Sequence, residues 1–197
     1  MKAAWLCVFF LTLTWSAVNP RDYPTWLLEV GPALIGLGIM AYTYNSFRLT
    51  PLLYGLILAH CIVLMVGGHY TYAEVPLFDY LKPVFGWERN NYDKLGHFMQ
   101  GFVPAILARE ILIRKAVVAS AGWRNLFIIS ICLAFSAFYE MLEWWVAIAT
   151  GTASEAFLGT QGYIWDTQSD MAMALLGAVV ALLTLASLHD RQLTAVK

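Results

Sequence analysis

The sequence predicts an all-α membrane protein, a bundle of about six transmembrane helices in a single domain that covers residues 1–197. The chain is 60% hydrophobic and 13% charged, with a mean hydropathy of +0.64, whereas soluble domains are about 25% charged. Its apolar residues also gather into segments of roughly 17 to 25 residues, the length that a helix needs to cross a bilayer. The net charge of -1 provides no basic surface for nucleic acid, so membrane lipids are the expected partners.

Six apolar segments are the expected helices. They are residues 2–18, 26–44, 51–66, 94–114, 125–150 and 163–188, and residues 67–93 form a long connection between the third and the fourth. The first segment also resembles a secretory signal with a weak cleavage region near Ser16. We favour a retained helix, because the segment is bulky and aromatic and the pair Asn19-Pro20 makes a suitable turn after it.

The basic residues predict the orientation of these helices. With six spans, one side of the membrane holds eight of the 12 Lys and Arg residues: Lys2, Arg48, Arg109, Arg114, Lys115, Arg124, Arg191 and Lys197. The other side holds Arg21, Lys82, Arg89 and Lys94. The positive-inside rule therefore predicts a multi-pass protein of the bacterial plasma membrane with both termini in the cytoplasm.

Three of the expected helices carry ionisable side chains at helical spacing. Asp93 and His97 are four residues apart in the fourth helix, and Asp166 and Asp170 are four apart in the sixth. Ionisable groups inside a membrane are costly and are functional candidates by default. A third pair follows in the fifth helix, three residues apart: Glu140 and Glu143. At about 1.5 Å of rise per residue, all three pairs fall at a similar depth near the outer ends of their helices, which predicts one shared site.

Each pair also has an ordinary structural interpretation. Asp93 and Asp166 would each serve as a helix cap, and a histidine in an apolar helix is often a satisfied core residue. His97 is flanked by Gly96 and Gly101, small residues that permit close helix packing. Gly101 and Gly177 are expected to bring the fourth and sixth helices together.

The glutamate pair is the hardest to explain by structure alone. Glu140 and Glu143 lie in an otherwise apolar and aromatic segment, where they need a basic partner, a metal ion or protonation. Few basic residues are expected at that depth, although Lys94 would serve one of the two. The neighbouring Trp144 and Trp145 are expected to belong to an interfacial aromatic belt.

The connection before the fourth helix would form the rim of such a site. Residues 67–76 are polar and aromatic and are interpreted first as a turn with an interfacial tyrosine cluster. A lid or substrate rim is the alternative, with His69, Tyr70 and Asp93 as its candidate residues. His60 and His189 receive no functional assignment.

The residue types favour a metal site. One histidine with several carboxylates suits zinc, manganese, iron or magnesium, and the candidate ligands are His97, Glu140, Glu143, Asp166 and Asp170. The candidate catalytic residues are His97, Glu140 and Glu143. No HExxH motif, Ser-His-Asp order or glycine-rich phosphate loop stands out.

Residues 93–98, 140–144 and 166–171, preceded by residues 68–72, together resemble the YjdF family of bacterial inner-membrane proteins, whose function is not known. The resemblance covers nearly the whole chain and implies a plasma-membrane location. Residues 93–177 are more distantly similar to VanZ-type membrane proteins, which are associated with glycopeptide resistance. Glu143 and Asp170 depart from that pattern, since VanZ proteins tend to have glutamine and asparagine there.

Three functions remain open at this stage. The leading hypothesis is a metal-assisted membrane enzyme that acts on a lipid or lipid-linked envelope substrate, with its site near the outer face. The second is a transport or binding protein that carries protons or cations on its carboxylates. The third is a structural membrane subunit whose polar groups hold helices together without catalysis.

Overall fold

The computed structural model describes residues 2–150 and 160–195 of the chain, and within these residues all regular secondary structure is helical. The seven helices are α1 (Lys2–Ala17), α2 (Tyr23–Thr43), α3 (Pro51–Tyr70), α4 (Pro76–Phe85), α5 (Tyr92–Arg114), α6 (Ala121–Thr150) and α8 (Asp166–Leu193). The predicted all-α bundle is therefore confirmed. Residues 151–159 of the last expected connection lie outside the described residues.

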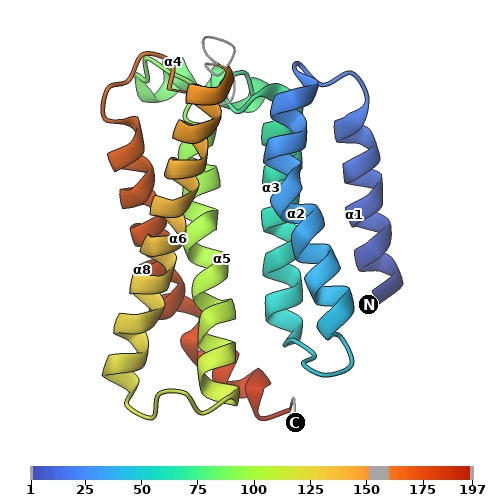
Figure 1. Cartoon of the computed structure of the whole chain (residues 1–197), viewed down its shortest axis with the longest axis vertical. Helices are drawn as coiled ribbons and strands as arrows, with labels where there is room; N and C mark the ends of the chain where they lie inside the picture. The colour runs from blue at the N-terminus through green and yellow to red at the C-terminus, as the bar shows by residue number, and fades with distance from the viewer. Residues whose placement is uncertain (1, 151–159, 196–197) are drawn as a thin grey trace.

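The long helices run side by side in two groups (Figure 1). Helices α1, α2 and α3 form one group and α5, α6 and α8 the other, and α3 packs against α5 to join them. In Figure 1, α5 and α8 begin at the upper end of the bundle and finish at the lower end. Lys2 and Ala195 line one cavity, so the described chain starts and finishes at the same end, as the even number of expected spans predicted.

Two helix starts show how local sequence defines these elements. The Asp22 side chain accepts a hydrogen bond from the Thr25 amide at 2.8 Å, which caps α2. Thr50 caps α3 in the same way and is followed by Pro51. Proline suits the first turn of a helix because its backbone has no N–H group to satisfy.

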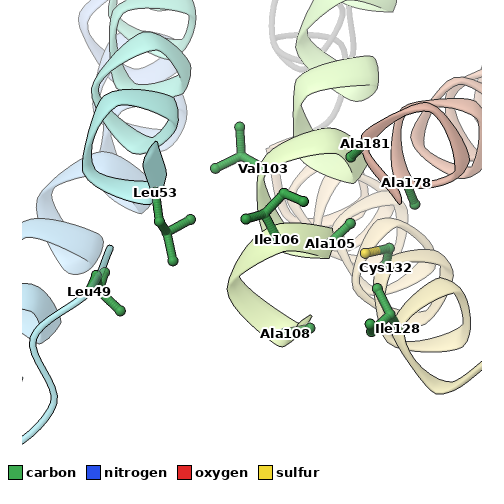
Figure 2. Packing of buried hydrophobic residues seen from close by; sticks show 10 residues of the cluster. All are labelled: Leu49, Leu53, Val103, Ala105, Ile106, Ala108, Ile128, Cys132, Ala178 and Ala181. Atoms are coloured by element: carbon green, nitrogen blue, oxygen red, sulfur yellow. The ribbon is translucent and has the colours of Figure 1, made fainter. Parts of the chain in front are cut away.

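The apolar core lies where α3 meets the second group of helices. Figure 2 shows Leu53 of α3 beside Val103 and Ile106 of α5, with Ile128 of α6 and Ala178 of α8 completing the cluster. All five residues are buried. This cluster sits toward the lower half of the bundle, and a smaller apolar cluster around Tyr72, Val75 and Tyr92 lies at the upper end.

Helices α5 and α8 make the closest contact in the bundle. A Cβ atom on Gly101 would overlap the Ala174 carbonyl group, and one on Gly177 would overlap the Phe98 carbonyl oxygen. The two glycines are therefore required for backbone-to-backbone packing. The predicted role of this pair is confirmed.

The count of about six spans is approximate. Four helices, α2, α3, α6 and α8, are long and apolar enough to cross a membrane. Helix α1 has 16 residues and is shorter, and α5 has 23 residues but carries charged side chains. Both lie alongside the other four in Figure 1.

The connection expected over residues 67–93 is partly helical. Residues 67–70 extend α3, so the expected end of that helix at residue 66 was wrong. Helix α4 was not foreseen either. Its ten residues are too few to span a bilayer, and Leu77, Tyr80 and Phe85 are exposed on it, as in a helix that lies at a membrane surface.

Candidate functional site

The upper half of the bundle holds a buried polar cluster centred on His97. Helix α5 contributes Asp93, Lys94 and His97, which share one region of its first two turns. Helix α6 contributes Glu140 and Glu143, and α8 contributes Asp166 and Asp170. Every one of these side chains except Lys94 belongs to a buried residue. We call these seven residues, together with Arg89, the His97 cluster.

His97 touches both other helices of the group. Its Nε2 atom lies 3.4 Å from Asp93 Oδ1 and 3.9 Å from Asp170 Oδ1. Its Nδ1 atom lies 3.0 Å from Gln100 Oε1 and 3.8 Å from Glu140 Oε1. The described neighbours of Nε2 are carboxylate oxygens, which only accept hydrogen bonds. A favourable contact between Nε2 and these oxygens therefore requires that the nitrogen carry a proton or bind a cation that the oxygens share.

The aspartates of α8 are held by two basic residues. Lys94 Nζ lies 2.6 Å from Asp170 Oδ1 and 2.9 Å from Asp166 Oδ1. Arg89 Nη1 donates to the same Asp166 oxygen at 2.5 Å. Asp166 is thus part of an ion-pair network at the edge of the cluster, and it belongs to neither group of ligand atoms that converge on His97.

Two sets of side chains bring ligand atoms close enough to hold one ion. Asp93, His97 and Asp170 form one, and His97, Glu140 and Glu143 form the other, each with its atoms within 4.8 Å of one another. His97 belongs to both. Four of the five predicted metal ligands therefore belong to one or the other of these two groups, and Asp93, which was predicted as a helix cap or a rim residue beside His97, takes the place of Asp166.

Two oxygen atoms of this cluster have no hydrogen-bond partner. Glu140 Oε1 and Asp93 Oδ2 are buried and accept no hydrogen bond from the part of the chain that the structure describes. A buried carboxylate oxygen without a donor is costly. Asp93 Oδ2 still lies 3.6 Å from Arg89 Nη2 and 3.7 Å from Lys94 Nζ, so Glu140 Oε1 is the atom that an added cation or proton would stabilise most.

The cap interpretations of the two aspartates were wrong. Asn91 precedes α5 and Trp165 precedes α8, and neither helix has a side-chain hydrogen bond at its cap. Asp93 and Asp166 lie inside the first turn instead, where their charge still suits the positive end of the helix dipole.

Three residues of this region were missed by sequence reasoning. Glu29 of α2 is buried and lies 3.3 Å from the Tyr139 hydroxyl group of α6, which donates to it. Tyr72, just after α3, also donates to Glu29. Its ring fills the space beside Gly67 and Gly96. A lone glutamate in an apolar helix was the available signal for Glu29. Tyr72 lies in the expected tyrosine cluster of residues 67–76 but was not assigned to the site, and nothing in the sequence marked Tyr139.

The predicted rim residues occupy a different place from the cluster, apart from Asp93. His69 Nδ1 lies 3.0 Å from the Ser16 carbonyl oxygen, and the His69 ring packs against Trp15 and Tyr70 at centroid distances of 4.6 Å. These contacts fasten the end of α3 to the end of α1. In the described ranges, no ion pair or hydrogen bond joins His69 or Tyr70 to the His97 cluster.

A second buried polar cluster lies at the lower end, centred on Glu110 of α5. Its carboxylate accepts from the Thr50 hydroxyl group at 2.8 Å, Arg114 Nη1 at 2.8 Å and His189 Nε2 at 3.0 Å. Arg109 Nη1 lies 3.0 Å from His189 Nδ1. Since arginine only donates, Nδ1 accepts and Nε2 carries the proton that Glu110 receives. We call Thr50, Arg109, Glu110, Arg114 and His189 the Glu110 cluster.

Comparison with known proteins places the chain in a family. Residues 1–191 match the family described as "Predicted membrane protein (DUF2238)". The chain is 49% identical to "Inner membrane protein YjdF" of Escherichia coli (strain K12) over 183 residues, 93% of this chain and 88% of that protein. No solved structure matches the chain, and the more distant similarity to VanZ-type proteins stays a prediction. The chain is a multi-pass protein of the bacterial inner membrane and belongs to this DUF2238 family.

Proposed function

We propose that the His97 cluster binds a divalent cation and that the protein is a metal-assisted enzyme acting on a lipid or lipid-linked envelope substrate. The observation that carries this proposal is a charge imbalance. The His97 cluster holds five buried carboxylates, against two basic residues, Arg89 and Lys94. Such an excess of negative charge inside a membrane protein calls for a compensating cation or for protons.

The residues present fit a hard divalent ion. Carboxylate oxygens with one imidazole suit zinc, manganese, iron or magnesium. Glu140 supports this fit best, because its Oε1 atom is buried without a donor and lies 3.8 Å from His97 Nδ1. The residue also belongs to the ligand group that includes His97 and Glu143. Gln100 hydrogen-bonds to His97 Nδ1 and would orient the ring, as outer partners of metal-bound histidines do.

A bound cation would supply a Lewis acid or an activated water at neutral pH. The residues around it would perform the remaining tasks. Glu140 or Glu143, whichever does not hold the ion, is positioned to accept a proton from that water. Lys94 and Arg89 lie on the Asp166 side of the cluster and would attract an anionic group of the substrate.

The position of the cluster supports a substrate that arrives through the membrane. The site lies in the upper half of the bundle, among helices that cross a bilayer, and α4 covers this end with an exposed apolar surface. By the distribution of basic residues, this end faces away from the cytoplasm. A lipid-borne group reaches such a depth more readily than a water-soluble one.

Metal analysis of the purified protein tests the first half of the proposal. We expect about one equivalent of a transition metal or magnesium after dialysis, and a loss of most of it in His97→Ala and Glu143→Gln. Glu74→Gln is the control, because it removes a carboxylate outside the cluster whose ion pair with Arg21 is exposed. Absence of metal from wild-type protein that has been reloaded with each ion in turn would refute the metal site.

Product formation tests the second half. Protein in liposomes of total bacterial lipid is incubated with and without the bound ion, and lipids are compared by mass spectrometry. A new lipid species that requires both the ion and Glu140 supports an enzyme. Identical lipid profiles for wild type and Glu140→Gln would contradict it.

One feature favours a second candidate, a cation-coupled transporter. His97 belongs to two ligand groups that lie side by side, which suits an ion that moves from one to the other. Cation flux in liposomes that is lost in His97→Ala, without any new lipid product, would support a transporter rather than an enzyme.

A further inference from the structure

A cavity of about 920 Å³ lies at the lower end of the bundle, far along the helices from the His97 cluster. It is formed by the start of α1, the end of α2 and the turn into α3. One wall is apolar and includes Leu6, Leu37 and Met40. This volume is typical of sites that take a small organic ligand.

The opposite wall of this cavity is basic. Lys2, Arg48 and Arg114 line it, and none of the described lining residues is acidic. Lys2 Nζ lies 3.9 Å and Arg48 Cζ 4.9 Å from the centroid of the Tyr44 ring. Both cations therefore lie against the Tyr44 ring, which keeps them near one another despite their like charge.

The charges of Lys2 and Arg48 are uncompensated within the part of the chain that the structure describes. Neither forms an ion pair there, whereas Arg114 is paired with Glu110 at 2.8 Å. Arg114 also donates to the Arg48 carbonyl oxygen at 2.6 Å, which fixes the turn beside the cavity. Two exposed cations at the mouth of an apolar cavity favour an anionic ligand with an apolar part.

We propose that this cavity binds an anionic phospholipid, with its phosphate group between Lys2 and Arg48 and an acyl chain along Leu37 and Met40. Basic pockets between membrane helices are suited to such headgroups. A free phosphate ion would use the cations but not the apolar wall. The proposal is independent of the function of the His97 cluster.

Lipid retention in detergent tests this proposal. Protein is reconstituted with equal amounts of phosphatidylglycerol and phosphatidylethanolamine, purified, and its bound lipid is measured by native mass spectrometry. We expect wild type to retain phosphatidylglycerol, and the double variant Lys2→Gln/Arg48→Gln to retain less by on the order of tenfold. The matched control is Lys115→Gln/Arg124→Gln, which removes equal charge at the same end from residues that do not line the cavity.

A second variant changes the shape and keeps the charge. Ala41 lines the cavity and is exposed, so Ala41→Trp fills it without disturbing the core and is expected to reduce retention as well. Equal loss in the control double variant, or equal retention of the two lipids by wild type, would overturn the proposal. Protection of wild type from heat by inorganic phosphate alone, as strongly as by phosphatidylglycerol, would also overturn it and indicate a free anion.

Discussion

The two buried polar clusters of this protein each combine a histidine with acidic and basic side chains, but they differ in their ratio of acids to bases and in how completely their polar atoms are hydrogen-bonded. Around Glu110, the carboxylate receives hydrogen bonds from Thr50, Arg114 and His189, and Arg109 completes the set. Within the described residues, no atom of the Glu110 cluster is buried without a partner. The His97 cluster has a surplus of carboxylates and two such oxygen atoms, on Asp93 and Glu140.

The difference separates structural groups from candidate functional ones. A fully satisfied network stabilises and orients helices, whereas a half-satisfied one is a net cost that a protein retains only for another reason. Both clusters include residues of α5 and α8. The same two helices therefore carry a fully hydrogen-bonded network at one end and a partly hydrogen-bonded one at the other. The ratio of acids to bases and the hydrogen bonds both distinguish the two clusters: one acid with two arginines around Glu110, and five acids with two basic residues around His97.

The largest effect is expected for the satisfied cluster. Glu110→Gln removes the charge that Arg114 faces and an acceptor that His189 and Thr50 need, so it should lower the free energy of unfolding by about 3 kcal/mol. Thermal or SDS-induced unfolding in mixed micelles measures this. Glu74→Gln is the control, because its ion pair with Arg21 is exposed and should contribute little. Equal stability of the two variants would remove the distinction between the clusters.

A smaller loss is expected at the basic edge of the His97 cluster. Lys94→Met leaves Asp170 without its 2.6 Å partner, while Asp166 keeps Arg89. We expect a loss of about 2 kcal/mol in the same unfolding assay, as for a buried charged group that loses its partner. The double variant Lys94→Met/Asp170→Asn should recover part of this loss. No recovery would show that Lys94 acts through something other than Asp170.

Neutralising an acid in the His97 cluster should change the free energy of unfolding very little. With chelator present, Glu143→Gln relieves like-charge repulsion and is expected to change stability by no more than about 1 kcal/mol, in either direction. This isosteric change is the direct counterpart of Glu110→Gln. A loss as large as that of Glu110→Gln would mean that Glu143 is as well satisfied as Glu110.

The smallest effect is expected outside both clusters, on α4. The hydrogen bond from Lys82, with a second from Asn90, lowers the pKa of Asp79 below its ordinary value of 3.8. Stability from this pair is therefore fully present above pH 3.8 and is lost as the pH falls through the lowered pKa. Since Asp79 is 44% exposed, the difference between wild type and Asp79→Asn should be a few tenths of a kcal/mol, roughly the value of a surface pair. A difference that persists unchanged at pH 2 would contradict this origin.

The sequence predicted much of the fold because a bilayer restricts what apolar segments do. Helices α1, α2 and α5 begin and end within about three residues of their expected bounds, whereas α3, α6 and α8 each extend four or five residues further at one end. Helix α4 was missed because ten residues of mixed polarity carry no membrane-spanning signal. Tertiary contact with α1 also holds the last turn of α3, where His69 meets Ser16, and the local sequence there resembled a turn.

The site was predicted in part, for a similar reason. Helical spacing and depth predicted that His97, Glu140, Glu143 and Asp170 lie close together. In the structure, these residues belong to two ligand groups that share His97. Spacing could not show that Lys94 and Arg89 neutralise Asp166. Nor could it show that Glu29 approaches from α2, because that contact depends on how the two groups of helices pack.

The glycine contacts between α5 and α8 limit how the upper half of the molecule is able to move. With Gly101 against Ala174 and Gly177 against Phe98, backbone meets backbone, and neither helix is free to slide or turn against the other. This packing therefore fixes the distance between Asp93 on α5 and Asp170 on α8. None of the described glycines packs α6 against α5 or α8 in this way. A movement of α6 that admits a bulky molecule would carry its two glutamates away from an imidazole that stays in place.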